Sequence, residues 1–291
     1  MEDNKYRRIL FAVDAQRHSR AAAPAVARLA EAASTEVVVL HVQPLVYVAR
    51  WGYWEPESLP EAQQLVREMV SKLIEAGVKA SGEVKTAERS RIADTIAETA
   101  RDLEADLVAV GSRGLSDLAG VFLGSVSHRV VQLLDCPVLV CPQNADVTKA
   151  PIGRILVAVA GGAEMTGALD TAATIAGLTG SEVIVVHVGF VYTGEAAAYA
   201  EPPEEGQALV DRAVAQLQDA GVKAMGWSFE GGSDIARDIA DTAGAWNADL
   251  IIVGSRRHSD LAAVFAGSVD HKVMQFSEKP VLVANRPSRR S

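Results

Sequence analysis

Apolar residues along the chain form two alternating patterns. Short, continuous apolar runs predict buried strands, and their lack of polar alternation favours a parallel sheet that is covered on both faces. Longer segments with apolar residues at helical spacing separate these runs. In the first half the expected strands are 8–14, 36–42, 78–84, 106–110 and 137–140, and the expected helices are 19–34, 61–76, 91–103 and 125–134. This alternation predicts βαβ units and an open parallel sheet.

The pattern lapses between residues 43 and 60, where the chain is rich in aromatic residues. Tyr47, Trp51, Tyr53 and Trp54 fall in this stretch. We expect an irregular segment that packs on its own domain or on its neighbour. A cover over a ligand and a surface for a partner protein are the alternatives.

The second half of the chain repeats the first. Residues 182–188 repeat 36–42, with His187 in the place of His41, and residues 267–273 repeat 124–130. A repeat of this length is a whole domain and not a solenoid unit. The chain is therefore expected to form two α/β domains, 1–146 and 147–291, joined by a polar linker at about 143–151.

Composition and charge narrow the class of protein. Of the 291 residues, 49% are hydrophobic and 22% are charged, which is typical of a soluble globular protein. The formal charge of −9 argues against nucleic acid or an anionic membrane as a main partner. No signal-peptide pattern or apolar run of ~18 residues is present, so we expect a cytoplasmic protein without membrane insertion. Cys136 and Cys141 flank a short strand and should lie on opposite faces, which argues against a mutual disulfide.

A glycine-rich stretch follows the strand at 106–110 and is the main candidate for chemistry. Residues 108–127 read VAVGSRGLSDLAGVFLGSVS, with glycines in the loop and at the start of the next helix. Glycine lets the backbone approach a ligand closely, and the first N–H groups of a helix favour an anion. The stretch therefore predicts a phosphate site, to which Ser125 adds a hydroxyl and Arg113 a positive charge.

The spacing G-x2-G-x9-G-S resembles the nucleotide motif of the universal stress protein family, in its ATP-binding branch. Gly111, Gly114, Gly124 and Ser125 match every fixed position, and the resemblance covers nearly the whole chain. It implies two tandem domains, each a Rossmann-like, open five-stranded parallel sheet flanked by helices.

The resemblance also implies the other residues of a nucleotide site. An aspartate at the end of the first strand faces the ribose or a metal on the phosphates, and the residue after the second strand lies against adenine. The expected nucleotide-binding residues are Asp14, Val42, Val110, Gly111, Arg113, Gly114, Gly124, Ser125, Val126 and Ser127.

The second half departs from this motif at two positions. Ala160 stands in the place of Asp14, and Arg257 in the place of Gly114, whereas Gly254, Gly267 and Ser268 remain. In one interpretation the second site is silent and this half is a structural partner. In the other, Arg256 and Arg257 hold phosphate, and the backbone amides of Gly161 and Gly162 replace the lost carboxylate.

No catalytic or metal-binding set is identified. The lysine of a Walker A motif is absent, the histidines and cysteines lack zinc spacing, and His41 and His187 are expected to be structural. The resemblance implies a nucleotide-dependent stress-response regulator that binds ATP, with or without Mg²⁺, and hydrolyses it slowly at most. It also implies a homodimer, pairing of the two domains of one chain through their last strands, and an unidentified regulatory protein partner. The alternatives are a nucleotide-independent interaction protein and a nucleotide-handling enzyme, although ligase-type signatures are absent.

Overall fold

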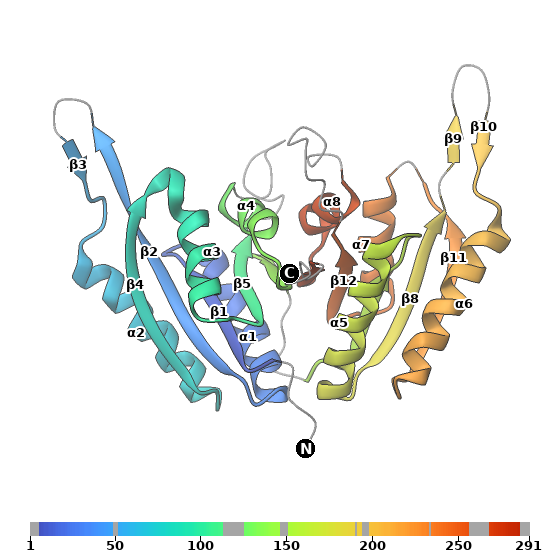
Figure 1. Ribbon diagram of the computed structural model, residues 1–291, viewed down its shortest axis with the longest axis horizontal. Coiled ribbons are helices and arrows are strands. Elements are labelled where there is room, and N and C mark those ends of the chain that lie inside the picture. Colours follow the sequence, from blue (N-terminus) through green and yellow to red (C-terminus); the bar gives the residue numbers. More distant parts are fainter. Residues whose placement is uncertain are drawn as a thin grey trace. The chain divides into compact units, whose positions relative to one another are not determined.

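The computed structural model describes residues 6–48, 52–112, 125–145, 151–189, 191–193, 198–232, 234–255 and 268–285. The chain forms two compact units, Met1–Lys149 and Ala150–Ser291, and both are α/β (Figure 1). Most of the predicted linker falls on residues 146–150, outside the described residues. Within the described chain, every helix is too short or too polar to cross a membrane.

The first unit is built on a parallel sheet in the strand order β4-β2-β1-β5-β6. Its elements are β1 (Arg8–Val13), α1 (Arg17–Ala32), β2 (Glu36–Val48), β3 (Gly52–Trp54), α2 (Leu59–Glu75), β4 (Ala80–Glu88), the 3₁₀ turn η1 (Arg89–Arg91), α3 (Ile92–Asp102), β5 (Leu107–Ser112), α4 (Ser125–Leu133) and β6 (Val138–Pro142). The predicted five-stranded parallel sheet is thus confirmed.

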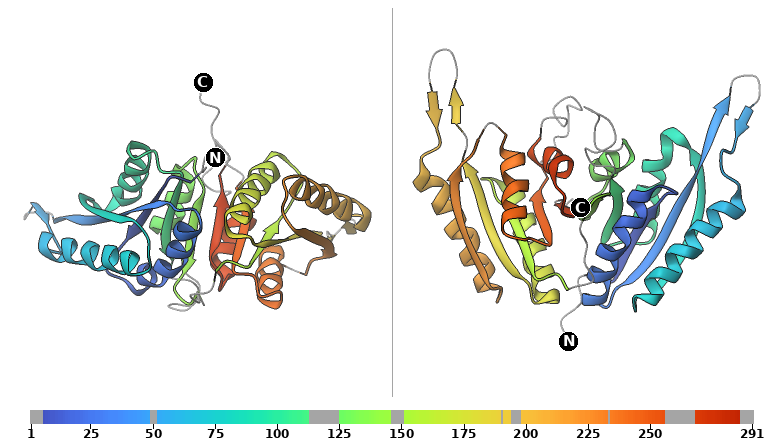
Figure 2. Two further views of the ribbon diagram at one scale, coloured as in Figure 1. Left: turned by 90° about the horizontal axis from the view of Figure 1, so that it is seen from below. Right: turned by 180° about the vertical axis from the view of Figure 1, so that it is seen from behind.

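Helices cover both faces of this sheet. α1 and α2 pack on one face, and α3 and α4 pack on the other (Figure 2). Ile9, Leu10 and Phe11 of β1 are completely buried between the two layers, as the continuous apolar run predicted. The strand order reverses beside β1, because β2 and β4 lie on one side of it and β5 and β6 on the other. Ligands of open α/β sheets bind at the carboxyl ends of strands at such a reversal.

The second unit has the same order, β11-β8-β7-β12-β13, and is again parallel. Its elements are β7 (Arg154–Ala158), α5 (Ala163–Thr179), β8 (Glu182–Gly189), β9 (Val191–Thr193), β10 (Ala198–Ala200), α6 (Pro203–Asp219), β11 (Ala224–Glu230), α7 (Ile235–Ala245), β12 (Leu250–Gly254), α8 (Val269–Phe276) and β13 (Val281–Ala284). The repeat seen in the sequence is therefore a repeat of topology.

The expectation of an irregular, packed segment at 43–60 is wrong for residues 43–48 and 52–54, whereas residues 55–58 are irregular. β2 continues to Val48, and its end pairs with β3 in a hairpin. Tyr47, Tyr53 and Trp54 are exposed on this hairpin, with 67%, 57% and 58% of their surfaces accessible. β-branched and aromatic residues favour the extended conformation, and pairing with β3 satisfies one edge of the extension. Trp51 lies outside the described residues.

Both cysteines are free thiols, as expected. Burial raises the pKa of Cys136 to about 11 and that of Cys141 to about 12. Both groups are therefore protonated, and poor nucleophiles, at neutral pH.

Candidate functional site

A pocket of about 570 Å³ opens in the first unit, where β1, β2 and β5 end and α4 begins. This volume is within the ~300–1,000 Å³ of small-molecule sites. Its walls combine polar and apolar side chains. The lining residues are Ala12, Val13, Asp14, Ala15, Gln16, Ser19, His41, Val42, Pro44, Val46, Pro56, Glu57, Arg89, Ile92, Val110, Gly111, Ser112, Val126 and Ser127.

Six of the ten residues expected to bind a nucleotide lie together on this pocket. They are Asp14, Val42, Val110, Gly111, Val126 and Ser127. Arg113, Gly114 and Gly124 lie outside the described residues. Ser125 begins α4, but its side chain also lies outside what the structure describes. Residues separated by more than a hundred positions thus share one wall because parallel strands end at the same edge of the sheet.

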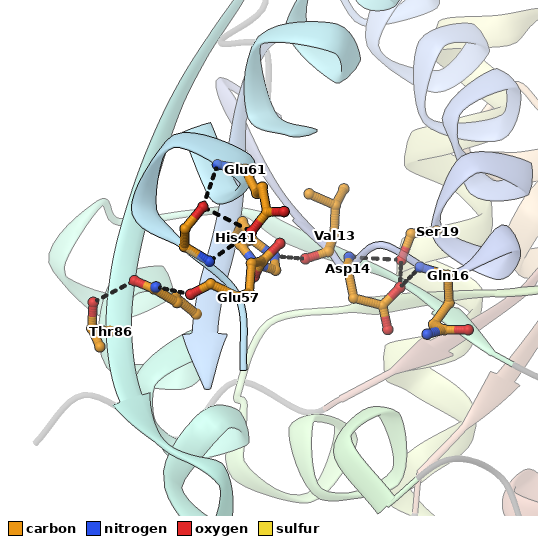
Figure 3. Close-up of polar contacts among 10 residues, drawn as sticks. Val13, Asp14, Gln16, Ser19, His41, Glu57, Glu61 and Thr86 are labelled. Atoms are coloured by element: carbon orange, nitrogen blue, oxygen red, sulfur yellow. Dashed lines mark hydrogen bonds and ion pairs between the residues drawn. The ribbon is translucent and has the colours of Figure 1, made fainter. Parts of the chain in front are cut away.

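Asp14 is held in place by the turn that leads into α1 (Figure 3). Its Oδ1 atom accepts hydrogen bonds from the Ser19 hydroxyl at 2.7 Å and from the Gln16 backbone N–H at 3.0 Å. The Ser19 hydroxyl oxygen in turn accepts from the Asp14 backbone N–H at 3.0 Å. The carboxylate is therefore oriented before any ligand arrives, as a preformed site requires.

His41 joins the end of β1 to the segment before α2. Its Nδ1 atom lies 2.8 Å from the Val13 carbonyl oxygen, and its Nε2 atom lies 2.6 Å from Oε2 of Glu57. The Gln43 side chain donates to the Glu57 carbonyl oxygen at 2.6 Å, so Glu57 is fixed through its side chain and its backbone (Figure 3). His41 is thus a structural histidine, as expected, although it also lines the pocket.

Ser112 ends β5 and contributes a buried hydroxyl to the pocket wall. Only 1% of its surface is accessible, and its Oγ atom has no hydrogen-bond partner among the described residues. A buried hydroxyl without a partner costs ~1–3 kcal/mol. A ligand with an acceptor or donor at this wall would remove that cost.

Several lining residues were not singled out from the sequence as site residues, and Ser19, Glu57, Ser112 and Arg89 are the ones that matter most here. Ser19 and Glu57 act through hydrogen bonds that no local pattern predicts. Ser112 adjoins the first glycine of the motif, and its position at the end of an apolar strand was a usable signal. Arg89 gave no signal, because only the parallel pairing of β4 with β2 brings its segment to the pocket.

α4 begins at the pocket, and an ion pair holds it to α3. Arg129 Nη2 donates to Asp94 Oδ1 at 3.0 Å, and this hydrogen bond lowers the pKa of Asp94. In the second unit Lys272, which stands in the place of Arg129, pairs instead with Asp234 at the N-cap of α7, at 3.2 Å. The N-terminal turn that faces the pocket is thereby fixed relative to the sheet.

The second unit preserves the histidine arrangement of the first. His187 Nδ1 lies 2.9 Å from the Val159 carbonyl oxygen, and Nε2 lies 3.0 Å from each carboxylate oxygen of Glu201. This arrangement persists although Ala160 replaces Asp14 in the same turn. The histidine pairing therefore serves the fold of both units and does not depend on the acidic residue.

A third departure separates the second unit from the first. Asp270 stands where Ser127 stands, in the first turn of α8, and is buried. A carboxylate there occupies the positive end of the helix dipole, which in the first unit is left without an acidic side chain. Arg256, Arg257 and Gly267 lie outside the described residues.

The described residues contain no cluster of three or more His, Cys, Asp or Glu side chains placed to hold a metal ion. Asp14 and Glu57 are the carboxylates on the described part of the pocket, and because Glu57 faces His41, Asp14 is the candidate ligand. One carboxylate is compatible with Mg²⁺ that is carried by the phosphates of a ligand, because Mg²⁺ commonly takes one or two protein carboxylates and completes its shell with phosphate oxygens and water.

Comparisons with known proteins agree on both halves of the chain. The family model described as "Universal stress protein family" matches residues 5–142 and 151–285. A universal stress protein of Mycobacterium tuberculosis strain H37Rv is 27% identical over 301 residues, covering 96% of this chain and 97% of the relative. One from Bacillus subtilis is 31% identical over 147 residues, covering 46% of this chain and 98% of the relative. The crystal structure of a universal stress protein from Archaeoglobus fulgidus has a TM-score of 0.74 at 20% identity, covering 98% of this chain and 100% of that one.

Proposed function

The chain belongs to the universal stress protein family, and from that premise we propose that its first unit binds ATP and thereby acts as a nucleotide-dependent regulator of the stress response. The observation that carries the proposal is the gathering of Asp14, Val42, Gly111 and Ser127 on one pocket at the carboxyl edge of the sheet. A carboxylate, an apolar wall and a helix N-terminus are the three features that ribose, a base and phosphates need.

The phosphate end of the proposed site is at β5 and α4. Gly111 and Ser112 end the strand, and α4 starts with Ser125, Val126 and Ser127. The first N–H groups of a helix carry the positive end of its dipole and favour anions. The unpartnered Ser112 hydroxyl adds a group that a phosphate oxygen would satisfy.

We further propose that the second unit does not bind ATP. Ala160 removes the carboxylate of the first unit, and the buried Asp270 places a negative charge where phosphate would approach α8. Two like charges at short distance disfavour each other strongly in a poorly hydrated site. Of the two interpretations of the second half, the silent one is therefore preferred.

We expect hydrolysis of the bound nucleotide to be slow or absent. Both ring nitrogens of His41, the histidine on the pocket wall, face acceptor oxygens of Val13 and Glu57. Both nitrogens are therefore engaged by protein oxygens and are not available to orient an attacking water. The proposal is therefore a binding function in which ATP occupancy, and not turnover, is the signal.

Nucleotide stoichiometry tests the proposal. Purified protein is denatured, released nucleotide is quantified by chromatography, and ATP is then titrated into stripped protein by calorimetry. We expect about one ATP per chain, with binding lost in Asp14→Ala and retained in Glu98→Gln, a surface control in α3. Two ATP per chain would refute the silent second unit, and no binding at physiological ATP would refute the nucleotide function itself.

The regulatory part of the proposal has a separate test. Hydrogen exchange and oligomeric state are measured with and without saturating ATP. A change in exchange at the edge of the pocket, or in the mass of the assembly, is expected if occupancy is transmitted. Identical exchange and mass at saturation would leave ATP binding without a regulatory consequence.

A second candidate function is favoured by the hairpin β2–β3. Tyr47 and Tyr53 contact edge to face with their ring centroids 5.5 Å apart, and both remain exposed beside Trp54. Exposed aromatic groups are enriched where proteins bind one another. A nucleotide-independent interaction protein would use this surface equally well with and without ATP, and the stoichiometry experiment distinguishes it from the first candidate.

A further inference from the structure

Arg89 is a charged residue on the pocket wall that the nucleotide motif does not include. It begins η1, directly after β4 ends, and it lines the pocket together with Ile92, Pro44 and Val46. Its side chain is exposed, and it forms no ion pair or hydrogen bond with any residue that the structure describes. A cation thus lines the pocket without a partner among the described residues.

The acidic residues around Arg89 are engaged elsewhere. Glu88 accepts a hydrogen bond from the Tyr53 hydroxyl at 2.6 Å, and Glu57 pairs with His41. The neighbouring Arg91 pairs with Glu98 at 3.0 Å. Both carboxylates thus have other partners among the described residues, and neither forms an ion pair with Arg89.

The second unit provides an internal comparison. There β11 ends at Glu230, and Gly232 stands three residues before the start of α7, as Arg89 stands three residues before the start of α3. The arginine is therefore found in the first unit, which has the complete nucleotide motif, and glycine replaces it in the second unit.

Strand order separates Arg89 from the phosphate end of the pocket. Arg89 follows β4, whereas Ser112 ends β5, and the order β4-β2-β1-β5 places three strand spacings between them. At ~4.8 Å a spacing, the two strand ends lie roughly 14 Å apart. A nucleotide with its phosphates on the glycine loop would direct its base, and not its phosphates, toward Arg89.

We propose that Arg89 recognises the nucleobase of the bound nucleotide, its guanidinium stacking on the base or donating to a ring nitrogen. Arginine suits both roles, because its planar group stacks on aromatic faces and presents several donors. The apolar side chains of Pro44, Val46 and Ile92 complete a wall of the kind that a flat base needs. This inference rests on the proposed nucleotide site and adds a specificity-determining residue to it.

The test compares ATP with two ligands that each contain only part of it. Binding of ATP, adenosine and inorganic tripolyphosphate is measured by displacement calorimetry for the wild type, Arg89→Gly and Arg89→Gln. Arg89→Gly copies the second unit, and Arg89→Gln guards against an effect of glycine on η1. The matched control is Arg91→Gln, which removes a neighbouring charge that does not line the pocket.

We expect both Arg89 variants to bind ATP and adenosine about tenfold more weakly, because a hydrogen bond to a charged group is worth that much, while tripolyphosphate binds as in the wild type. Unchanged binding of all three ligands would overturn the assignment of Arg89. So would a loss confined to ATP and tripolyphosphate, since Arg89 would then act on phosphates. A wild type that binds none of the ligands would instead refute the nucleotide site and, with it, this inference.

Discussion

His41 and Glu57 form a short side-chain contact, with 2.6 Å between Nε2 and Oε2, and both residues line the pocket. The other ring nitrogen faces the Val13 carbonyl oxygen, directly before Asp14. The ring of His41 therefore connects the turn that carries Asp14 to the segment before α2. This histidine is almost completely buried.

Replacing His41 should destabilise the first unit. His41→Ala leaves the Val13 carbonyl and the Glu57 carboxylate without this partner, at a cost of roughly 1–3 kcal/mol in the free energy of unfolding. Urea denaturation of His41→Ala, Glu57→Gln and the double variant measures the coupling between the two side chains. Strictly additive effects would show that the contact contributes nothing, and His187→Ala is the matched variant in the second unit.

Ser112→Ala should separate stability from binding. The alanine removes a buried hydroxyl that has no partner in the described protein, so the melting temperature should stay the same or rise. ATP affinity should fall, because the hydroxyl is proposed to meet the ligand. Differential scanning calorimetry and ATP titration of the same sample check both signs, and a lower melting temperature with unchanged affinity would contradict the proposed role.

Ser127→Asp should weaken ATP binding in the first unit, as Asp270 is proposed to do in the second unit. It places a carboxylate in the first turn of α4, as Asp270 does in α8. The negative charge stabilises the helix end yet repels phosphate, so we expect at least about a tenfold loss of ATP affinity without a loss of fold. Circular dichroism and ATP titration are the measurements, with Ser127→Ala as the uncharged control, and equal effects of the two substitutions would rule out repulsion as the cause.

Acid should remove the contribution of Glu182 to the stability of the second unit. Hydrogen bonds from Arg154 and Lys223 lower the pKa of Glu182 below its ordinary value of 4.5. Because the pKa of Glu182 is lower in the folded protein, its contribution to stability is complete above pH 4.5. This contribution is lost as the pH falls through the folded-state pKa. The pair is partly exposed, so the contribution is under about 1 kcal/mol.

Melting temperatures of wild type and Glu182→Gln between pH 7 and pH 2.5 test this expectation. The difference between them should be present at pH 7 and should close as the pH falls below 4.5. Glu36→Gln is the matched variant, because the equivalent pair in the first unit, Arg8 and Glu36, is looser at 3.9 Å. A difference that persists at pH 2.5 would assign the effect to packing.

The sequence predicted the sheet, its helices and the repeat because each apolar run is long enough to specify a strand. Glycine spacing predicted a nucleotide site at the end of β5, and the structure places the predicted residues Asp14, Val42 and Ser127 together on a pocket there. The hairpin at β2 and β3 was missed, since a stretch in which Pro44 and Gly52 stand among aromatic residues is equally typical of a loop. Contacts such as Gln43 with Glu57, and the position of Arg89, depend on strand pairing across the sheet, which no local pattern encodes.

The pairing of Val46 with Trp54 has a practical consequence for the first unit. Val46 lines the pocket, and Trp54, its partner across the hairpin, has 58% of its surface exposed. In the second unit Trp227 and Trp246 instead pack against each other, with ring centroids 4.5 Å apart. Indole emission depends on the polarity around the ring, so the protein carries a native fluorophore one strand pair away from its pocket. We expect occupancy of the pocket to change the emission of Trp54, so that binding can be followed optically and without a label.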